Sequence, residues 1–248
     1  MAKRDVCAII QARMTSPRLP GKVLMPILGK PALLHQLERL AHCRNLDRIV
    51  IATTINREDD PIAAFAARQG YPHTRGSELD VLDRYWRAAS EYGRDVVVRI
   101  TSDCPLIDPA VTDATIAHFL ESDPPLDYVS NTLEKTWPRG MDTEVFTFAG
   151  LDRAHREAHA QPEREHVTPY FYRHPELFRL SCYKNDRDWS GYRLTLDTED
   201  DFRLINAVFT ALYGEGRVFD VAEMVALIES RPELKALNAH VKQKELGH

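Results

Sequence analysis

Short apolar runs alternate with longer segments of helical periodicity through the first half of this 248-residue chain. Three runs fit strands that are buried on both faces: 6–12, 48–54 and 96–103. The segments after them place apolar residues three or four positions apart and are predicted helices: 31–43, 57–70, 78–93 and 108–122. Repeated strand–helix units of this length predict an α/β fold with a mostly parallel, mixed central sheet and helices on both faces.

The second half of the chain is less regular. Its expected strands are 142–148, 177–184 and 192–198, and its expected helices, the second only partly helical, are 149–160, 163–175, 199–214 and 219–234. We find no linker, repeat or low-complexity tract, so we predict a single domain over 1–248 with a small inserted lobe at about 130–190. The C-terminal stretch 234–248 is amphipathic and suggests no chemistry.

Composition excludes several classes of function. The net charge of −5 gives no general basic surface, so nucleic acid is not an expected partner. No segment approaches the roughly 20 apolar residues that span a bilayer, so no membrane association is expected. The four cysteines are far apart and form no CxxC pair, which favours free thiols in a reducing compartment. We therefore predict a soluble, cytoplasmic protein.

A basic loop follows the first predicted strand. Arg13, Arg18 and Lys22 supply positive charge, and Ser16 and Gly21 let backbone N–H groups approach an anion. The loop has neither the Walker pattern nor GxGxxG, but it has what a polyphosphate needs. The alternative is a solvated turn whose cations bind nothing.

Two aspartates also follow predicted strands, at the sheet edge where ligands bind in open parallel sheets. Asp103 and Asp197 are carboxylates of the kind that hold Mg²⁺ together with phosphate oxygens. Each has an alternative role as a turn or helix cap. Together with the basic loop they favour nucleotidyl transfer, in which a nucleophilic oxygen attacks the α-phosphate of a nucleoside triphosphate and pyrophosphate leaves.

Several segments carry a resemblance to a known family. The stretch QARMTSPRLPGKVL resembles the signature ARxxSxRLPGKxL of the CMP-Kdo and CMP-sialic acid synthetase superfamily. Further segments resemble one branch of it, the spore-coat polysaccharide biosynthesis cytidylyltransferase-like family: RGSELDVLDRY, VRITSDCPLIDP, DYVSNTLEKTWPRGMDTEVF, EREHVTPY and RLTLDTEDDF. The resemblance runs from about residue 5 to residue 213. This chain has Gln11 where the better-known synthetases have Pro, and SDCP where the Kdo enzymes have GDEP.

The resemblance implies a nucleotide-diphosphosugar-transferase-like fold, CTP as donor and Mg²⁺ as cofactor. It implies a metal site at Asp103 and Asp197, and we expect these two residues with Arg13 and Lys22 to be catalytic. Its nucleotide-binding residues would be Ala12, Arg13, Ser16, Arg18, Lys22, Arg75, Ser77, Asp83, Arg84 and Asp103. Of these, the four from Arg75 to Arg84 belong to the segment that closes over cytosine and ribose.

The resemblance also places an acceptor site and a partner. Candidate acceptor-binding residues are Arg139, Asp142, Glu144, Glu163, His166 and Tyr170. An arginine suits an acceptor carboxylate or phosphate, whereas the alternative for His166 is packing in the core. The expected acceptor is an acidic small molecule, and the expected product is a CMP-activated sugar acid for surface polysaccharide or glycoconjugate synthesis. A homodimer is expected, with 133–141 and the lobe strands as its surface.

Two other functions stay open from the sequence. A nucleotide-sugar-dependent glycosyltransferase shares this fold class, and the letters DRD at 186–188 fit its metal motif, although they stand in a predicted loop. A non-catalytic binding protein that keeps the fold is less favoured, because both aspartates and the basic loop are present.

Overall fold

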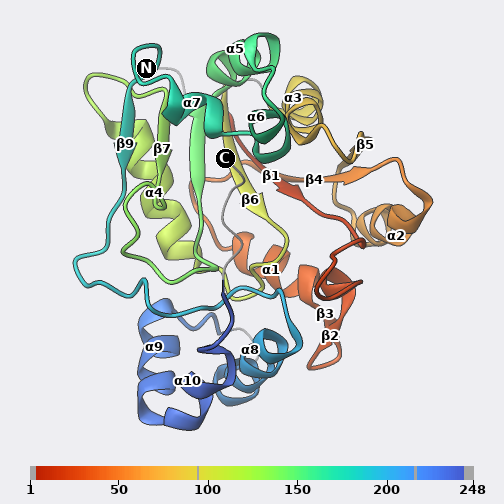
Figure 1. Ribbon diagram of the computed structural model, residues 1–248, viewed down its shortest axis with the longest axis vertical. Coiled ribbons are helices and arrows are strands. Elements are labelled where there is room, and N and C mark those ends of the chain that lie inside the picture. Colours follow the sequence, from red (N-terminus) through yellow and green to blue (C-terminus); the bar gives the residue numbers. More distant parts are fainter. Residues whose placement is uncertain (1–3, 94, 215–216, 243–248) are drawn as a thin grey trace.

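A seven-stranded mixed sheet forms the centre of the molecule (Figure 1). The computed structural model describes residues 4–93, 95–214 and 217–242. The strand order is β5 (His73–Gly76), β4 (Arg48–Thr54), β1 (Val6–Gln11), β6 (Val96–Thr101), β8 (Glu144–Thr147), β7 (Tyr128–Ser130) and β9 (Leu180–Cys182). The first four strands are parallel to one another, and β8 runs antiparallel to both β6 and β7. A small hairpin, β2 (Pro26–Ile27) and β3 (Lys30–Pro31), stands apart.

Strand β1 shows why this sheet is buried on both faces. Val6, Ala8 and Ile10 belong to one apolar cluster, and Cys7 and Ile9 belong to another on the opposite face. All five are at most 2% exposed. The alternation follows from the two-residue period of a strand, and it confirms the expected two-sided burial.

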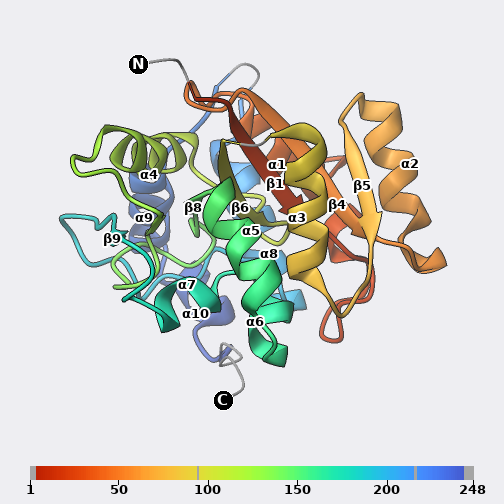
Figure 2. The same cartoon turned by 90° about the horizontal axis from the view of Figure 1, so that it is seen from above.

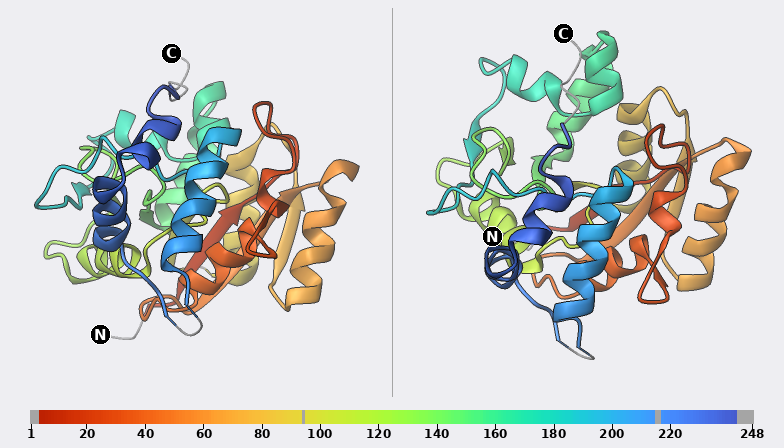
Figure 3. Two further views of the ribbon diagram at one scale, coloured as in Figure 1. Left: turned by 90° about the horizontal axis from the view of Figure 1, so that it is seen from below. Right: turned by 60° about the horizontal axis from the view of Figure 1, so that its bottom comes forward.

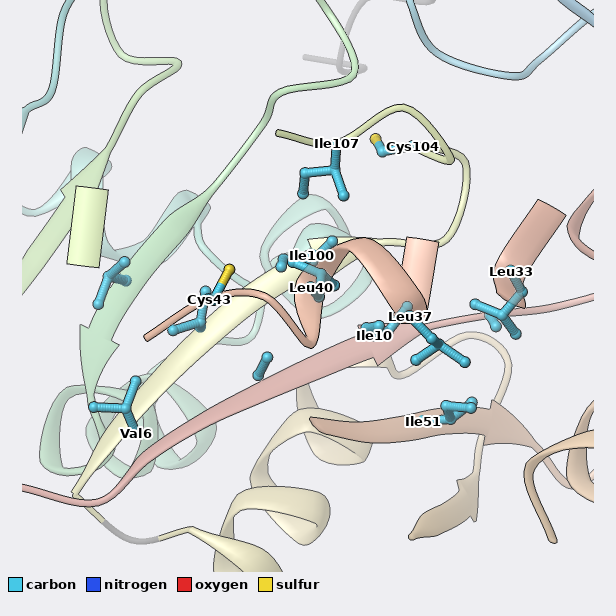
Figure 4. Packing of buried hydrophobic residues seen from close by; sticks show 14 of the residues in the cluster. Val6, Ile10, Leu33, Leu37, Leu40, Cys43, Ile51, Ile100, Cys104 and Ile107 are labelled. Carbon is cyan, nitrogen blue, oxygen red and sulfur yellow. The ribbon is translucent and has the colours of Figure 1, made fainter. Parts of the chain in front are cut away.

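Helices cover both faces. One face carries α1 (Ala32–Leu40), α2 (Asp60–Gln69) and α4 (Pro109–Glu121), and Figure 4 shows part of their apolar cluster. The other carries α3 (Val81–Tyr92), α5 (Phe148–Glu157), α6 (Gln161–His166) and α7 (Pro169–Arg173); α3 and α5 lie side by side in Figure 2. A third apolar cluster joins α8 (Glu199–Leu212), α9 (Val221–Ser230) and α10 (Pro232–Asn238), drawn in blue in Figure 3.

Local sequence explains where several helices begin and end. Asp108 caps α4 by accepting a 2.8 Å hydrogen bond from the N–H of Ala110, and Pro109 occupies the first turn. Gly70 ends α2 in the left-handed conformation, at φ 74°. Thr198 and Asp201 form a reciprocal capping box at the start of α8. Short 3₁₀ turns are found at Lys22–Leu24 and Arg57–Asp59.

Several expected elements differ from the observed ones. The expected strand 192–198 is wrong: within this segment only Arg193 forms a bridge, to Arg139, and the bridge is an isolated one outside the strands of the sheet. The expected helix 163–175 divides into α6 and α7 at Val167, where φ is 71°. The expected helix 219–234 divides into α9 and α10 before Pro232. Strands β5 and β7 were not expected.

The segment 130–190 does not stand apart from the sheet as an inserted lobe. It supplies β8 and β9 to the main sheet, and its helices α5, α6 and α7 cover one face. Within the described ranges, no helix has both the length and the apolar character that a membrane span requires. Positions 243–248 of the C-terminal stretch lie outside the described residues.

Candidate active site

A cavity of about 350 Å³ opens where β1 and β6 end. The carboxyl ends of parallel strands are the usual ligand-binding edge of an open α/β sheet. The cavity is lined by Gln11, Ala12, Arg13, Ser16, Pro17, Arg18, Lys22, Glu78, Leu79, Val81, Arg84, Thr101, Ser102, Asp103, Glu165, His166 and Asp197. The basic loop and both predicted metal aspartates therefore meet at one cavity.

The basic loop is held by its own backbone and by a buried carboxylate. The carbonyl of Met14 accepts hydrogen bonds from the N–H groups of Ser16 and Gly21, at 3.0 and 2.8 Å. Gly21 has φ 73°, a conformation that suits glycine and directs the chain into the 3₁₀ turn that begins at Lys22. Asp59, which the sequence did not single out, accepts a 2.6 Å hydrogen bond from the N–H of Met14.

Lys22 lies at the centre of the site. Its Nζ donates to Oδ2 of Asp103 at 3.3 Å, to Oδ1 of Asp197 at 2.7 Å and to the carbonyl of Leu196 at 2.7 Å. Burial on its own would lower the pKa of Lys22, but the two carboxylates outweigh it and raise the pKa above its usual value. The ammonium group therefore stays charged between the two aspartates.

The two aspartates have different further partners. Burial acts to raise the pKa of Asp103, but the attraction of Lys22 and a hydrogen bond from Thr101 Oγ1 at 2.6 Å keep it below the usual value. Asp197 presents Oδ2 to two guanidinium groups, those of Arg18 and Arg193, each at 2.8 Å. Both carboxylates therefore accept hydrogen bonds from cationic side chains, Asp103 from Lys22 and Asp197 from Lys22 and the two arginines.

The donor set fits Mg²⁺. The oxygens of Asp103 and Asp197 already converge on one small cation, the ammonium of Lys22. Among the described residues no group of three or more potential metal-ligating side chains occurs, so any ion here would take its other ligands from phosphate and water. Mg²⁺ is bound in just this way in many nucleotide sites, through one or two carboxylates.

The side of the cavity formed by β1 and α3 carries unsatisfied polar atoms. Nε and Nη1 of Arg84 and Oε1 of Gln11 are buried and have no hydrogen-bond partner among the described residues. Burial lowers the pKa of Arg84, which is only 4% exposed. A Cβ at Gly76 would come 2.7 Å from Cγ of Arg84, so glycine there leaves room for this side chain. Buried polar groups without partners are costly and rare in folded proteins, so each of these atoms needs a physical explanation.

Three predicted nucleotide-binding residues do not reach the cavity. Arg75 donates to the carbonyls of Thr54 and Asn56, at 2.7 and 2.9 Å. Ser77 Oγ accepts from the N–H groups of Leu79 and Asp80. Asp83 accepts from Arg87 and His155. In the structure Arg75, Ser77 and Asp83 thus hold the segment before and within α3, and Arg84 is the member of this group that lines the cavity. A nucleotide-binding role for the other three stays a prediction.

Of the predicted acceptor residues, only His166 lines the cavity. Burial lowers its pKa, which favours the neutral imidazole. Glu144 is buried among Arg99, Tyr128 and Thr168 and accepts hydrogen bonds from all three. It is therefore a structural carboxylate in the sheet rather than a free acceptor ligand.

The other acceptor candidates lie elsewhere. Tyr170 turns away and donates a 2.6 Å hydrogen bond to Glu157. Glu163 is buried, and its Oε1 lies 3.9 Å from Nη1 of Arg173. Arg139 lines a separate cavity of about 240 Å³ beside α10.

Asp142 is also absent from the lining of the active-site cavity. Its pKa is raised to about 6, mainly by burial and further by the charge of Asp103.

Sequence reasoning missed several residues of the site. One of them is Glu78, in the stretch RGSELDVLDRY. It lines the cavity and accepts hydrogen bonds from Arg13, Thr15 and Asn56. Arg193 had no signal beyond its position four residues before Asp197. The DRD letters at 186–188 lie in an exposed turn and do not line the cavity.

Comparisons with known proteins show what this chain is similar to. A family model described as cytidylyltransferase matches residues 7–242. An uncharacterised protein of Methanocaldococcus jannaschii, MJ1063, is 38% identical over 245 residues and 96% of each chain. The spore coat polysaccharide biosynthesis protein SpsF of Bacillus subtilis is 34% identical over 237 residues, which is 92% of this chain and 96% of SpsF.

More distant and structural relatives extend the comparison. A 3-deoxy-manno-octulosonate cytidylyltransferase of Geobacter sulfurreducens is 36% identical over 121 residues, 48% of this chain and 46% of that protein. A solved cytidylyltransferase of Leptospira borgpetersenii is 33% identical with a TM-score of 0.88, covering 99% of this chain and 100% of that one. A basic loop and two aspartates that converge on Lys22 are thus found at the cavity of a chain that belongs to the cytidylyltransferase family, within the CMP-Kdo and CMP-sialic acid synthetase superfamily.

Proposed function

We propose that this protein transfers CMP from CTP to an acidic sugar or related acidic metabolite and releases pyrophosphate, in the synthesis of a surface polysaccharide or glycoconjugate. One observation carries the proposal: Lys22 Nζ joins Asp103 and Asp197 at the cavity that the basic loop lines. The names of the relatives support the cytidylyl group and a sugar pathway.

The basic loop would hold the triphosphate. Arg13, Arg18 and Lys22 line the cavity together with Ser16. Gly21 takes the left-handed conformation that the loop needs at this turn. Guanidinium groups bind phosphate through paired hydrogen bonds, whereas an ammonium group acts as a compact charge. When a triphosphate enters, Arg18 and Lys22 would exchange carboxylate partners for phosphate oxygens, which frees Asp197 and Asp103.

Asp103 and Asp197 would then hold Mg²⁺, which when bound neutralises charge on the transferred and departing phosphates. The acceptor hydroxyl oxygen forms a bond to the α-phosphorus, and the bond from that phosphorus to the bridging oxygen breaks. Pyrophosphate leaves with the bonding electrons, and the acceptor proton passes to solvent. The arginines and Lys22 stabilise the charge that grows on the departing oxygens.

Arg84 and Gln11 would read the base. Cytosine presents two acceptors, O2 and N3, and one donor, the N4 amino group. The free N–H groups of Arg84 suit the two acceptors, and the free Oε1 of Gln11 suits the donor. Uracil has a hydrogen-bond donor at N3, which would face a donor N–H group of Arg84, and two donors repel each other.

The acceptor would enter beside α6. Glu165 and His166 of this region line the cavity together with the basic loop. The acidic character of the acceptor rests on resemblance, since a relative is named for 3-deoxy-manno-octulosonate, which is a sugar acid. Arg13 has a side chain that is 46% exposed and is the most accessible cation for an acceptor carboxylate.

Pyrophosphate release tests the proposal. We expect release that requires CTP, Mg²⁺ and one member of a panel of acidic sugars, and that is much slower with UTP, ATP or GTP. Asp103→Asn should lose most turnover while its circular dichroism stays that of the wild type. Nucleoside diphosphate release from a UDP- or GDP-sugar, without pyrophosphate release from CTP, would instead indicate a glycosyltransferase.

We also propose a homodimer in the cytoplasm. Strand β9 is an edge strand of the central sheet, and Leu133 near it is 39% exposed. An edge strand and an exposed apolar side chain are features of interfaces. Four free cysteines support a reducing compartment. Light scattering coupled to gel filtration tests the dimer: a mass near 57 kDa, about twice the 28.3 kDa chain, is expected.

A further inference from the structure

A buried polar network connects the C-terminal helix α10 to the active-site aspartate Asp197. Arg193 donates from Nη2 to Oδ2 of Asp197 at 2.8 Å and from Nε to Oδ1 of Asp201 at 2.9 Å. Asp201 is completely buried and also accepts a 3.0 Å hydrogen bond from the backbone N–H of Asp197. Arg193 and Asp201 therefore fix the side chain and the backbone of Asp197 by hydrogen bonds.

Asn238 completes this network from α10. Its Nδ2 donates to Oδ1 of Asp201 at 2.8 Å and to the carbonyl of Arg193 at 3.0 Å. Both partners are acceptors, so the amide nitrogen, with its two hydrogens, is the group that must face them. Asn238 is 5% exposed, although it lies 41 residues after Asp197 in the sequence and near the end of the described chain.

We propose that Asn238 is a positioning residue for the metal site, acting through Asp201 and Arg193 on the carboxylate of Asp197. This inference rests on the proposed function, because it assigns Asp197 to Mg²⁺. Partners behind a metal ligand fix its orientation, and their loss commonly costs about tenfold to a hundredfold in metal affinity or activity. Helix α10 packs on α8, whose first turn contains Asp201, so the C-terminal segment becomes part of the active site.

The geometry separates this role from simple packing of α10. Leu234, on the same helix, is buried in the apolar cluster of α8 and α9 and has no polar connection to Asp197. Leu234→Ala therefore loosens the helix through lost apolar contacts, whereas Asn238→Ala removes the two hydrogen bonds of the network. Asn238→Asp goes further and places a carboxylate against that of Asp201.

Metal binding by the full-length chain tests the inference. Mn²⁺ serves as the probe, and its free concentration is followed by EPR in the presence of CTP. We expect both Asn238 variants to bind Mn²⁺ about tenfold more weakly than the wild type, and to lose kcat more than they raise KM for CTP. Leu234→Ala should lower the melting temperature and leave Mn²⁺ affinity unchanged.

Each outcome decides the inference. Unchanged Mn²⁺ affinity in the Asn238 variants would overturn it, as would equal weakening in Leu234→Ala. Wild-type protein that binds no Mn²⁺ with CTP would overturn both the metal assignment and this inference. Wild-type protein that binds Mn²⁺ and CTP but transfers CMP to no acceptor would overturn only the proposed function. If Asn238→Asp does not fold, Asn238→Ala supplies the comparison.

Discussion

Lys22 Nζ lies 2.7 Å from Oδ1 of Asp197, a residue 175 positions away in the sequence. With Asp103 3.3 Å from the same nitrogen, the ammonium group occupies the place where the two carboxylates converge. Under the proposed function this charge would have two uses: it attracts both aspartates in the free protein, and it would bind a phosphate once another cation replaces it there. This exchange makes the site testable without knowledge of the acceptor.

Lys22→Met removes the charge between the two aspartates. Both carboxylates lose their shared partner, so we expect the free energy of unfolding to fall by about 3 kcal/mol. Because Mg²⁺ can take the vacated position, it should raise the melting temperature of the variant more than that of the wild type, in the absence of nucleotide. Turnover should fall on the order of a hundredfold or more, since a phosphate contact is also lost.

The control for this prediction is Lys30→Met. Lys30 forms an exposed ion pair with Glu38 at 2.8 Å, so its loss should change stability little and should not create a response to Mg²⁺. Differential scanning fluorimetry across a Mg²⁺ titration makes the comparison. Equal responses of wild type and Lys22→Met would argue against a shared metal position.

Arg84→Met should have opposite effects on the free protein and on nucleotide binding. The guanidinium of Arg84 is buried with Nε and Nη1 unpaired, so an apolar chain of similar length should raise the free energy of unfolding by about 1–2 kcal/mol. The thermal stabilisation that CTP gives should disappear, because the donors for the base are lost. Arg87→Met is the control: Arg87 lies three residues after Arg84 in α3, its side chain is 62% exposed, and it pairs with Asp83. A variant that binds CTP normally would remove Arg84 from the nucleotide site.

The contrast between Arg84 and Asp83 shows what the sequence could predict and what it could not. The motif located the correct segment, but adjacent residues on a helix point about 100° apart. Arg84 lines the cavity, whereas Asp83 faces Arg87 and His155. A motif of consecutive letters therefore includes residues that serve the ligand and residues that only hold the helix.

The apolar runs predicted the parallel core well, because strands β1, β4 and β6 are mostly apolar and mostly buried. They failed at β5, an edge strand with the polar sequence HTRG, and at β7, which has three residues. Asp197 lies at the same cavity as Asp103, as expected, although the expected strand before it is wrong. Its backbone position is set by Asp103, whose carbonyl accepts from Leu196, a contact between distant segments that no local pattern reports.

Asp142→Asn should make the protein more stable at neutral and alkaline pH. Burial, and then the charge of Asp103, raises the pKa of Asp142 from 3.8 to about 6, so the folded state favours the neutral acid. The contribution of Asp142 to the free energy of unfolding is therefore fully present below about pH 4 and is lost as the pH rises through about 6. The variant lacks this loss, which amounts to roughly 3 kcal/mol at most.

Melting temperatures between pH 4 and pH 8 check this prediction. The curves of the wild type and of Asp142→Asn should meet near pH 4, diverge between about pH 4 and pH 6, and stay a constant distance apart above pH 6, with the variant higher. Asp186→Asn, in an exposed turn, is the control and should follow the wild type at every pH. A variant less stable than the wild type at pH 8 would show that the ionised carboxylate of Asp142 has a favourable partner.

Glu144→Ala should affect stability and not acceptor binding. Glu144 pairs with Arg99 on the neighbouring strand and accepts hydrogen bonds from Tyr128 and Thr168, so its loss leaves a buried guanidinium without its carboxylate. Breaking a buried pair in this way costs about 3–5 kcal/mol, whereas Glu144→Gln, which keeps the shape and an acceptor oxygen, should cost less. Unfolding in guanidinium chloride measures the lost stability, and steady-state kinetics with the identified acceptor measures acceptor binding. A Glu144→Gln protein with wild-type stability and a raised KM for the acceptor alone would indicate that Glu144 binds the acceptor. A purely structural carboxylate would change stability and would not change the KM alone.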